Sequence, residues 1–254
     1  MKTTTIAIRS KIRPGPGLFS LALLFALFAL VISAGAASIT KADNTTALGT
    51  GSSWTGGTAP GSGDVATWSG GYAIAGSLTA ALPGSAVPWG GISIGSLSGA
   101  AVPTAAITAA SQSGTTVTIT AGTHAFAPGM TVVIAGVTPS GYNGTFTITG
   151  VPTSTTFTYT TGSGLTAGTA FGTASAMISI GGTGSAVASS ALTIGSSGID
   201  LSGANRSVVI NSVTSAFSGA QTWNTAAGKV IRFGTTGTGG ANAKVITSGS
   251  DGLI

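Results

Sequence analysis

The chain has 254 residues, of which 42 are Gly, 5% are charged and none is Cys, and its formal net charge is +5. The lack of Cys excludes disulfides and thiolate metal sites, so stability has to come from apolar burial and backbone hydrogen bonds. Four of the nine Lys and Arg residues precede residue 14, and after residue 38 five Lys and Arg face four Asp. No basic patch remains that would favour a nucleic-acid partner.

Residues 1–36 have the parts of a secretory signal peptide in order. A basic segment ends at Arg13, residues 18–32 are almost wholly apolar, and Ala34 and Ala36 supply small residues at the −3 and −1 positions. We therefore predict cleavage between Ala36 and Ala37, and no membrane span after the signal is removed. The alternative is an uncleaved membrane anchor, because small residues extend the apolar run to Ala37.

Residues 37–103 are predicted to form an N-terminal cap and the first strands of a solenoid. Residues 53–68 indicate a turn followed by a strand, and three large aromatics, Trp54, Trp68 and Trp89, punctuate this Gly-rich segment. One interpretation is that the indoles cover the open end of a solenoid, whose terminal coil lacks a neighbour. The other is that they are exposed and stack on sugar rings. No cluster of polar hydrogen-bonding residues lies nearby, which favours capping.

Residues 104–175 have a different residue pattern from the segments on either side and predict an inserted antiparallel β-module, a sandwich or barrel. Thr alternates with Val, Ile, Phe or Tyr, which is typical of antiparallel strands with one wet face. The expected strands are 116–120, 130–134, 145–148 and 156–160. Asn143-Gly144 supplies turn chemistry between two of them. A surface loop is where such an insertion costs least.

Residues 176–254 carry short β-branched triplets between Gly and Ser turns. The apolar members of each triplet lie two residues apart and so share one face of a strand. The triplets are Ile178-Ser179-Ile180, Leu192-Thr193-Ile194, Ile199-Asp200-Leu201 and Val208-Val209-Ile210, followed by Val230-Ile231. Such strands are satisfied by coiling, each pairing with its equivalent one coil on. Residues 92–95 (ISIG) repeat the pattern of residues 178–181 and are expected to form an earlier coil. We expect the C-terminal end to be open, for further repeats or self-association.

Two resemblances follow from these segments. Residues 192–204 (LTIGSSGIDLSGA) and 219–230 (GAQTWNTAAGKV), with residues 54–68, resemble the autotransporter-associated β-strand repeat proteins of Gram-negative and related bacteria. That resemblance implies a right-handed parallel β-helix passenger at the cell surface, and it implies no activity. Residues 124–136 and 141–146 resemble a small β-module of bacterial and phage-derived surface proteins, with His124-Ala125 where a His-Gly pair is usual. The 254 residues include no segment that resembles the C-terminal outer-membrane barrel or sorting tail of that family.

No catalytic, cofactor-binding or metal-ligating residue is predicted. His124 is the sole His and lies beside a turn, where a structural role is the usual one. Asp200 with Arg206 is the only acid–base pair on the solenoid, and an Asp that caps a corner accounts for it more simply. The acids are too few and too scattered for paired-carboxylate or Ca²⁺ chemistry.

The sequence therefore predicts an exported, non-enzymatic structural or adhesive β-solenoid protein, secreted or at a Gram-negative-type cell surface. Surface glycans are a further possible partner. One alternative is a polysaccharide-binding protein that uses exposed Trp side chains. The second alternative is a β-helix lyase or hydrolase, because parallel β-helices host carbohydrate-active enzymes.

Overall fold

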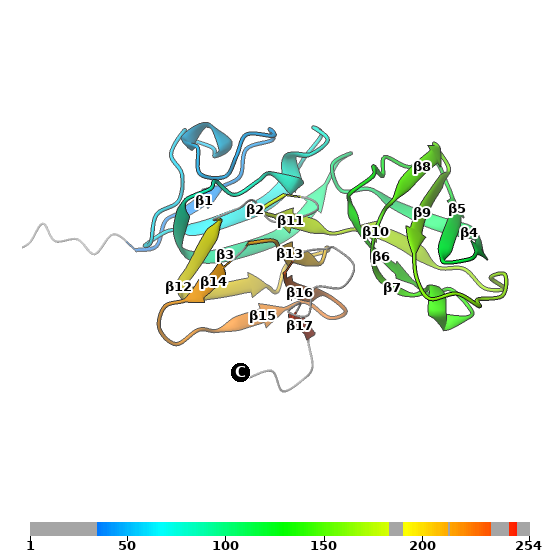
Figure 1. The fold of residues 1–254 in the computed structure, drawn as a ribbon. Helices are drawn as coiled ribbons and strands as arrows, with labels where there is room; N and C mark the ends of the chain where they lie inside the picture. Colours follow the sequence, from blue (N-terminus) through cyan, green and yellow to red (C-terminus); the bar gives the residue numbers. More distant parts are fainter. Residues whose placement is uncertain (1–34, 183–189, 213, 235–243, 248–254) are drawn as a thin grey trace, which may run out of the picture. The chain divides into compact units, whose positions relative to one another are not determined.

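The computed structural model describes residues 35–182, 190–212, 214–234 and 244–247 (Figure 1). Nearly all regular structure is β, with three short 3-10 turns at Gly51–Ser53, Ser77–Thr79 and Ser140–Tyr142. In the part described, no helix has the length and hydropathy to cross a bilayer. The strands form three sheets, two of them built from stacked coils.

The first sheet is parallel throughout and forms one wall of the solenoid. Its strands in spatial order are β1 (Ser38–Thr40), β2 (Val65–Gly71), β3 (Ala86–Ser98), β12 (Ala191–Leu201) and β14 (Thr214–Phe217), and β15 (Trp223–Thr225) also pairs with β12. The second sheet is the other wall. It contains β11 (Ile178–Ile180), β13 (Val208–Ile210) and β16 (Val230–Phe233) in parallel, and β17 (Lys244–Thr247) antiparallel to β16. The predicted parallel solenoid is confirmed.

Equivalent residues of successive coils stack in columns that run through the solenoid. Ile92 pairs with Ile199, which pairs with Trp223, and Trp89 pairs with Ile194. Each column buries apolar side chains against the next coil, which is how short strands with one apolar face build a continuous core. Neighbouring coils approach closely inside β12: Gly198 has a φ of +65°, and a Cβ there would collide with the carbonyl oxygen of Thr222. Only Gly is tolerated in such a position.

Two details of the expected solenoid strands are corrected. The triplets around Leu192 and Ile199 belong to one strand, β12, whose pairing with β3 shifts register between Ile194 and Gly198. Three residues of β12, residues 195–197, lie between these pairs opposite the single residue Gly90, so this Gly-Ser segment is a bulge and not a separating turn. Ile92 and Ser93 pair with Ile199 and Asp200 in the first sheet, whereas residues 178–180 lie in the second sheet. The similar ISI sequences therefore occupy different walls.

The third sheet is antiparallel and contains the whole predicted module. Its strands in spatial order are β7 (Gly144–Thr147), β6 (Thr131–Ala135), β10 (Thr173–Ala176), β4 (Thr104–Ser113), β5 (Thr116–Ala121), β9 (Thr156–Thr160) and β8 (Gly150–Thr153). The two edge strands of this sheet, β7 and β8, are consecutive in the chain and are joined by residues 148–149. Ile148 N donates to Met130 O, and the adjacent Thr149 N donates to Thr158 O. The module is therefore barrel-like.

The module lies at a corner between the two solenoid walls. In the following coil, the corner between β12 and β13 takes only residues 202–207, whereas the preceding corner, between β3 and β11, carries the module. The chain enters and leaves at neighbouring points, since Ala176 N donates to Pro103 O at 2.9 Å. The buried apolar residues also form two separate clusters, one from residues 48–102 with 178–231, and one from residues 105–176. Each part thus has its own core.

Candidate functional site

The three indoles singled out in the sequence are buried together in the solenoid. Trp54, Trp68 and Trp89 are 1–2% exposed, and their ring centroids lie 5.4–5.8 Å apart in edge-to-face contacts. Trp54 Nε1 donates to Leu48 O at 2.9 Å. This burial corrects the alternative in which these side chains are exposed and stack on sugar rings, because no ring face is free. They are also more than a terminal cover, since Trp68 and Trp89 lie within β2 and β3.

The N-terminal segment is held by the few ionisable groups that it contains. Lys41 is 2% exposed, and its ammonium donates to the carbonyl oxygens of Ala42 and Asn44. Burial lowers the pKa of Lys41 to about 8, and the nearby Asp43 opposes this shift. Asp43 accepts from the backbone N–H groups of residues 73 and 74, chiefly that of residue 73, which lowers the pKa of its carboxyl group. Tyr72 Oη donates to Lys41 O, and burial raises the Tyr72 pKa to about 12.

Because of this buried lysine, we expect the free energy of unfolding to rise with pH between pH 8 and pH 10. The folded-state pKa of Lys41 lies below its ordinary value of 10.5, so the unfolded chain binds more protons in that interval and folding gains as pH rises. Above pH 10 the gain ends, because Tyr72 ionises more readily in the unfolded chain. Urea denaturation at pH 7, 8, 9 and 10 measures this trend. A Lys41→Met variant should lose the rise, and a rise of unchanged size in that variant would contradict the assignment.

A second aromatic group, which the sequence did not single out as a site, lies on the coil that contains β14, β15 and β16. Phe217, Trp223 and Phe233 have ring centroids 5.1–5.7 Å apart and stack on Ile194, Ile199 and Ile210 of the coil before. Phe217 is 44% exposed. The available signal in the sequence was the recurrence of apolar residues from coil to coil, since Phe217, Trp223 and Phe233 continue the rows that Ile194, Ile199 and Ile210 belong to. Self-association or further repeats at this end stay a prediction.

The pair Asp200 and Arg206 is not brought together as an acid–base site. Asp200 Oδ1 accepts from Ser202 N at 2.9 Å, which is the corner-capping role expected from the sequence. Arg206 instead turns to the base of the module, where Nη2 donates to Thr104 Oγ1 at 2.8 Å and to Val102 O. Its neighbour Asn205 donates to Leu97 O and accepts from Leu97 N. The corner after β12 therefore binds the end of β3 through Asn205 and the start of the inserted module through Arg206.

His124 lies among aromatic side chains and away from any acid that the structure describes. Its ring centroid is 4.9 Å from that of Phe126 and 5.5 Å from that of Phe157, and neither ring nitrogen has a hydrogen-bond partner. Desolvation lowers its pKa, so the ring is neutral near pH 7. The surroundings fit a packed side chain better than a ligand or general base. Among the described residues, no group of three or more His, Cys, Asp or Glu is placed to hold a metal ion.

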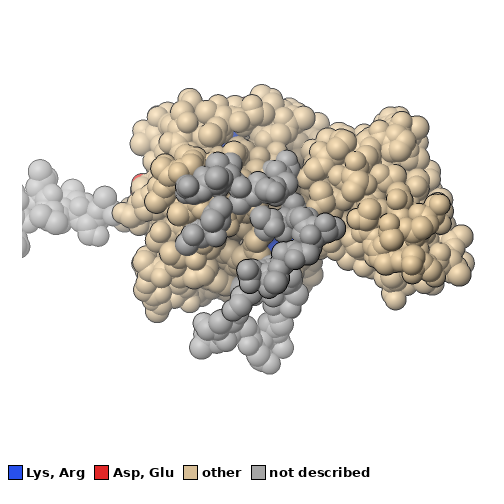
Figure 2. Space-filling view, viewed as in Figure 1, with Lys and Arg blue, Asp and Glu red and all other residues tan. Residues whose placement is uncertain are grey.

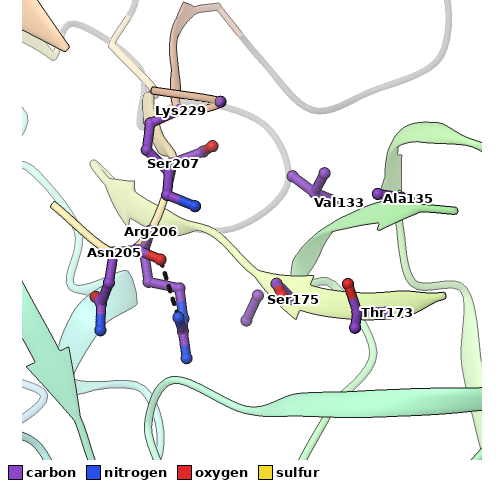
Figure 3. Close-up of a pocket in the computed structure, with 10 residues that line it drawn as sticks. Val133, Ala135, Thr173, Ser175, Asn205, Arg206, Ser207 and Lys229 are labelled. Atoms are coloured by element: carbon purple, nitrogen blue, oxygen red, sulfur yellow. Dashed lines mark hydrogen bonds between the residues drawn. The ribbon is translucent and has the colours of Figure 1, made fainter. Parts of the chain in front are cut away.

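A cavity of about 140 Å³ lies at the base of the module, and we call it the junction pocket. Figure 3 shows Asn205, Arg206, Ser207 and Lys229 on one side and Val133, Ala135, Thr173 and Ser175, from β6 and β10, on the facing side. Ala176 and Gly228 complete the lining. Two cationic side chains and no acidic one line it. The space-filling view in Figure 2 shows how sparse charge is on this face, where almost all described atoms belong to uncharged residues.

The predicted signal peptide falls almost wholly outside the described residues, and Ala34 with it. Ala36 and Ala37 are exposed, and Ala37 is the first residue of the ladder, because its carbonyl oxygen accepts from Val65 N at 2.7 Å. A compact unit extends from Ala36 onward. Cleavage after Ala36 would leave the first ladder contact intact.

No protein-family model, curated protein or solved structure matches this chain. Membership of the autotransporter-associated repeat family therefore stays a prediction. What the structure shows is the architecture itself: a parallel β-solenoid whose corner carries a seven-stranded antiparallel module.

Proposed function

We propose that this chain is an exported, non-enzymatic surface protein in which a β-solenoid displays an inserted module for adhesion. The observation that carries this proposal is how the inserted module is connected to the solenoid. Its chain enters and leaves at one hydrogen-bonded pair, Pro103 and Ala176, and its core is separate from that of the solenoid. A closed module on a repeat scaffold offers its loops to a partner while the scaffold supplies reach.

The surface chemistry supports an extracellular setting. The chain is rich in Gly and uncharged polar residues, contains no Cys and has a near-neutral balance after residue 38. The Asp side chains that the structure describes, Asp43, Asp64 and Asp200, each accept from backbone N–H groups of turns. Acids that are engaged in this way hold corners of the scaffold. This supports a structural role in preference to a glycosidic active site, which needs two facing carboxyl groups.

The proposal is tested by producing the whole chain with a C-terminal tag in a Gram-negative host. We expect the mature protein to begin at Ala37, by N-terminal sequencing, and the tag to be detected outside the cytoplasm. Cells that carry it should bind to host cells or glycan-coated surfaces, and a variant that lacks residues 104–175 should be exported but bind less. Retention of the uncleaved chain in the cytoplasm would overturn the export step, and equal binding would overturn the role of the module.

The enzyme alternative has its own readout. Incubation of the purified protein with acidic and neutral polysaccharides should release no new reducing or unsaturated ends. Depolymerisation that is lost in an Asp200→Ala variant would identify a carbohydrate-active enzyme instead. Asp64→Ala, which removes a different turn-capping carboxylate, is the matched control.

A further inference from the structure

The junction pocket brings together two cations without a counterion. Arg206 projects from the corner after β12 and Lys229 from the corner before β16, and both line the same cavity. No acidic side chain lines it. Both residues are half-buried, and an anion bound beside them would supply the negative charge that the lining lacks.

The acids elsewhere in the described residues do not supply that counterion. Asp200, the acid nearest in sequence to Arg206, is engaged with the backbone of Ser202. Asp43 and Asp64 accept from the backbone near residues 73 and 61, in the N-terminal part of the chain. The described acids therefore form no ion pair with the two cations at this cavity, and these cations are left to pair with a ligand.

Some of the hydrogen-bond donors around the cavity have no acceptor within the part of the protein that the structure describes. Arg206 uses Nη1 and Nη2 to hold Asn205 O, Val102 O and Thr104 Oγ1, and this fixes the guanidinium group. Its Nε is buried and has no hydrogen-bond partner. Ser207 Oγ accepts from Val230 N, which leaves its own proton to donate. Burial also lowers the Arg206 pKa, as expected for a cation without a neighbouring carboxylate.

We propose that the junction pocket binds one small oxyanion, a sulfate, phosphate or carboxylate group, between Lys229 and Arg206. The hydroxyl groups of Ser207, Ser175 and Thr173 face the same space and can donate to its oxygens. A volume of about 140 Å³ exceeds the ~30 Å³ share of one water molecule but is too small for an oligosaccharide. The ligand is therefore a free ion or a single charged group of a larger molecule. This site does not depend on the proposed adhesive function.

The test is a thermal-shift titration of the purified protein, at constant ionic strength with chloride as the balancing salt. Sulfate and phosphate should each raise the melting temperature in a saturable way, as ligands of the native state do. Glucuronate supplies the carboxylate arm, and glucose is its uncharged counterpart. Saturation by the inorganic ions alone identifies a free-ion site, and saturation by glucuronate as well identifies an acidic-sugar site. Either outcome supports the proposal, and a response to glucose equal to that of glucuronate would overturn it.

Variants separate this site from general charge effects. Lys229→Gln should weaken sulfate binding at least about tenfold, since a charge-assisted contact is lost. Arg232→Gln removes the same charge from β16, where the side chain does not line the cavity, and should leave the dissociation constant unchanged. Arg206→Lys keeps the charge but not the fork of donors and should also weaken binding. No saturable response to any oxyanion, or an equal response from the folded Lys229→Gln variant, would overturn the proposal.

Discussion

Replacing Trp89 with Ala is expected to lower the free energy of unfolding by about 3–5 kcal/mol, which is the usual cost of deleting a large buried aromatic side chain. Trp89 is 1% exposed and makes edge-to-face contacts with both Trp54 and Trp68. It also stacks on Ile194 of the next coil. Its removal leaves a cavity between two coils that backbone ladders hold at a set spacing, so the site has little freedom to collapse.

Trp223→Ala is the matched control for this prediction. Trp223 is the last described member of its column and only partly buried, so its loss should cost clearly less. Urea denaturation followed by far-UV circular dichroism measures both variants without relying on indole fluorescence. Equal losses in the two variants would show that the buried triad is no more important to the fold than the terminal ring.

Deleting residues 104–175 and joining Pro103 to Ala176 is expected to leave a folded solenoid. The two ends already lie in hydrogen-bond contact, at 2.9 Å between Ala176 N and Pro103 O. The next coil makes the same corner with residues 202–207 alone. The deletion loses the bond from Arg206 to Thr104 and that from Met177 N to Thr131 O. We therefore expect a cost of about 1–3 kcal/mol, and not loss of the fold.

Far-UV circular dichroism and a cooperative urea transition are the measurements for this deletion. A contrasting deletion of residues 116–160 removes β5, β6, β7, β8 and β9 but keeps β4 and β10 with their apolar faces uncovered. That variant should aggregate, because edge strands with exposed apolar faces pair between molecules. An unfolded chain after removal of residues 104–175 would show that the module is integral to the solenoid core.

Local patterns in the sequence were enough to predict most strands of the module. The Thr156–Thr160 strand, with Phe157 and Tyr159 on one face, agrees with its observed bounds, since alternation of Thr with large apolar residues leaves one choice of buried face. Three strands were missed. The Thr104–Ser113 and Thr173–Ala176 strands are rich in Ala, Ser and Gln, and the Gly150–Thr153 strand contains Gly and Pro and was expected to be a turn; all of these residues carry little β-propensity. The first two take their strand geometry from partners on both sides.

The candidate sites depended far more on tertiary contacts. The sequence around Trp54, Trp68 and Trp89 does not distinguish a buried indole from an exposed one. Only the stacking of β2 and β3 decided that they are buried. The approach of Arg206 and Lys229 could not be anticipated, because they lie in different coils and meet the module across a corner. No local pattern encodes a meeting of residues that are distant in the chain.

By itself, the sequence determined that the chain is an all-β repeat protein with a distinct antiparallel insert, because apolar residues two apart and Gly turns are local properties. The tertiary structure alone decided which coils are neighbours, and so which side chains lie in one column. It placed residues 92–95 and 178–180 in different walls despite their shared ISI sequence. It also placed two cations around one uncharged cavity, because each corner is positioned by the coils stacked on it and not by its own residues.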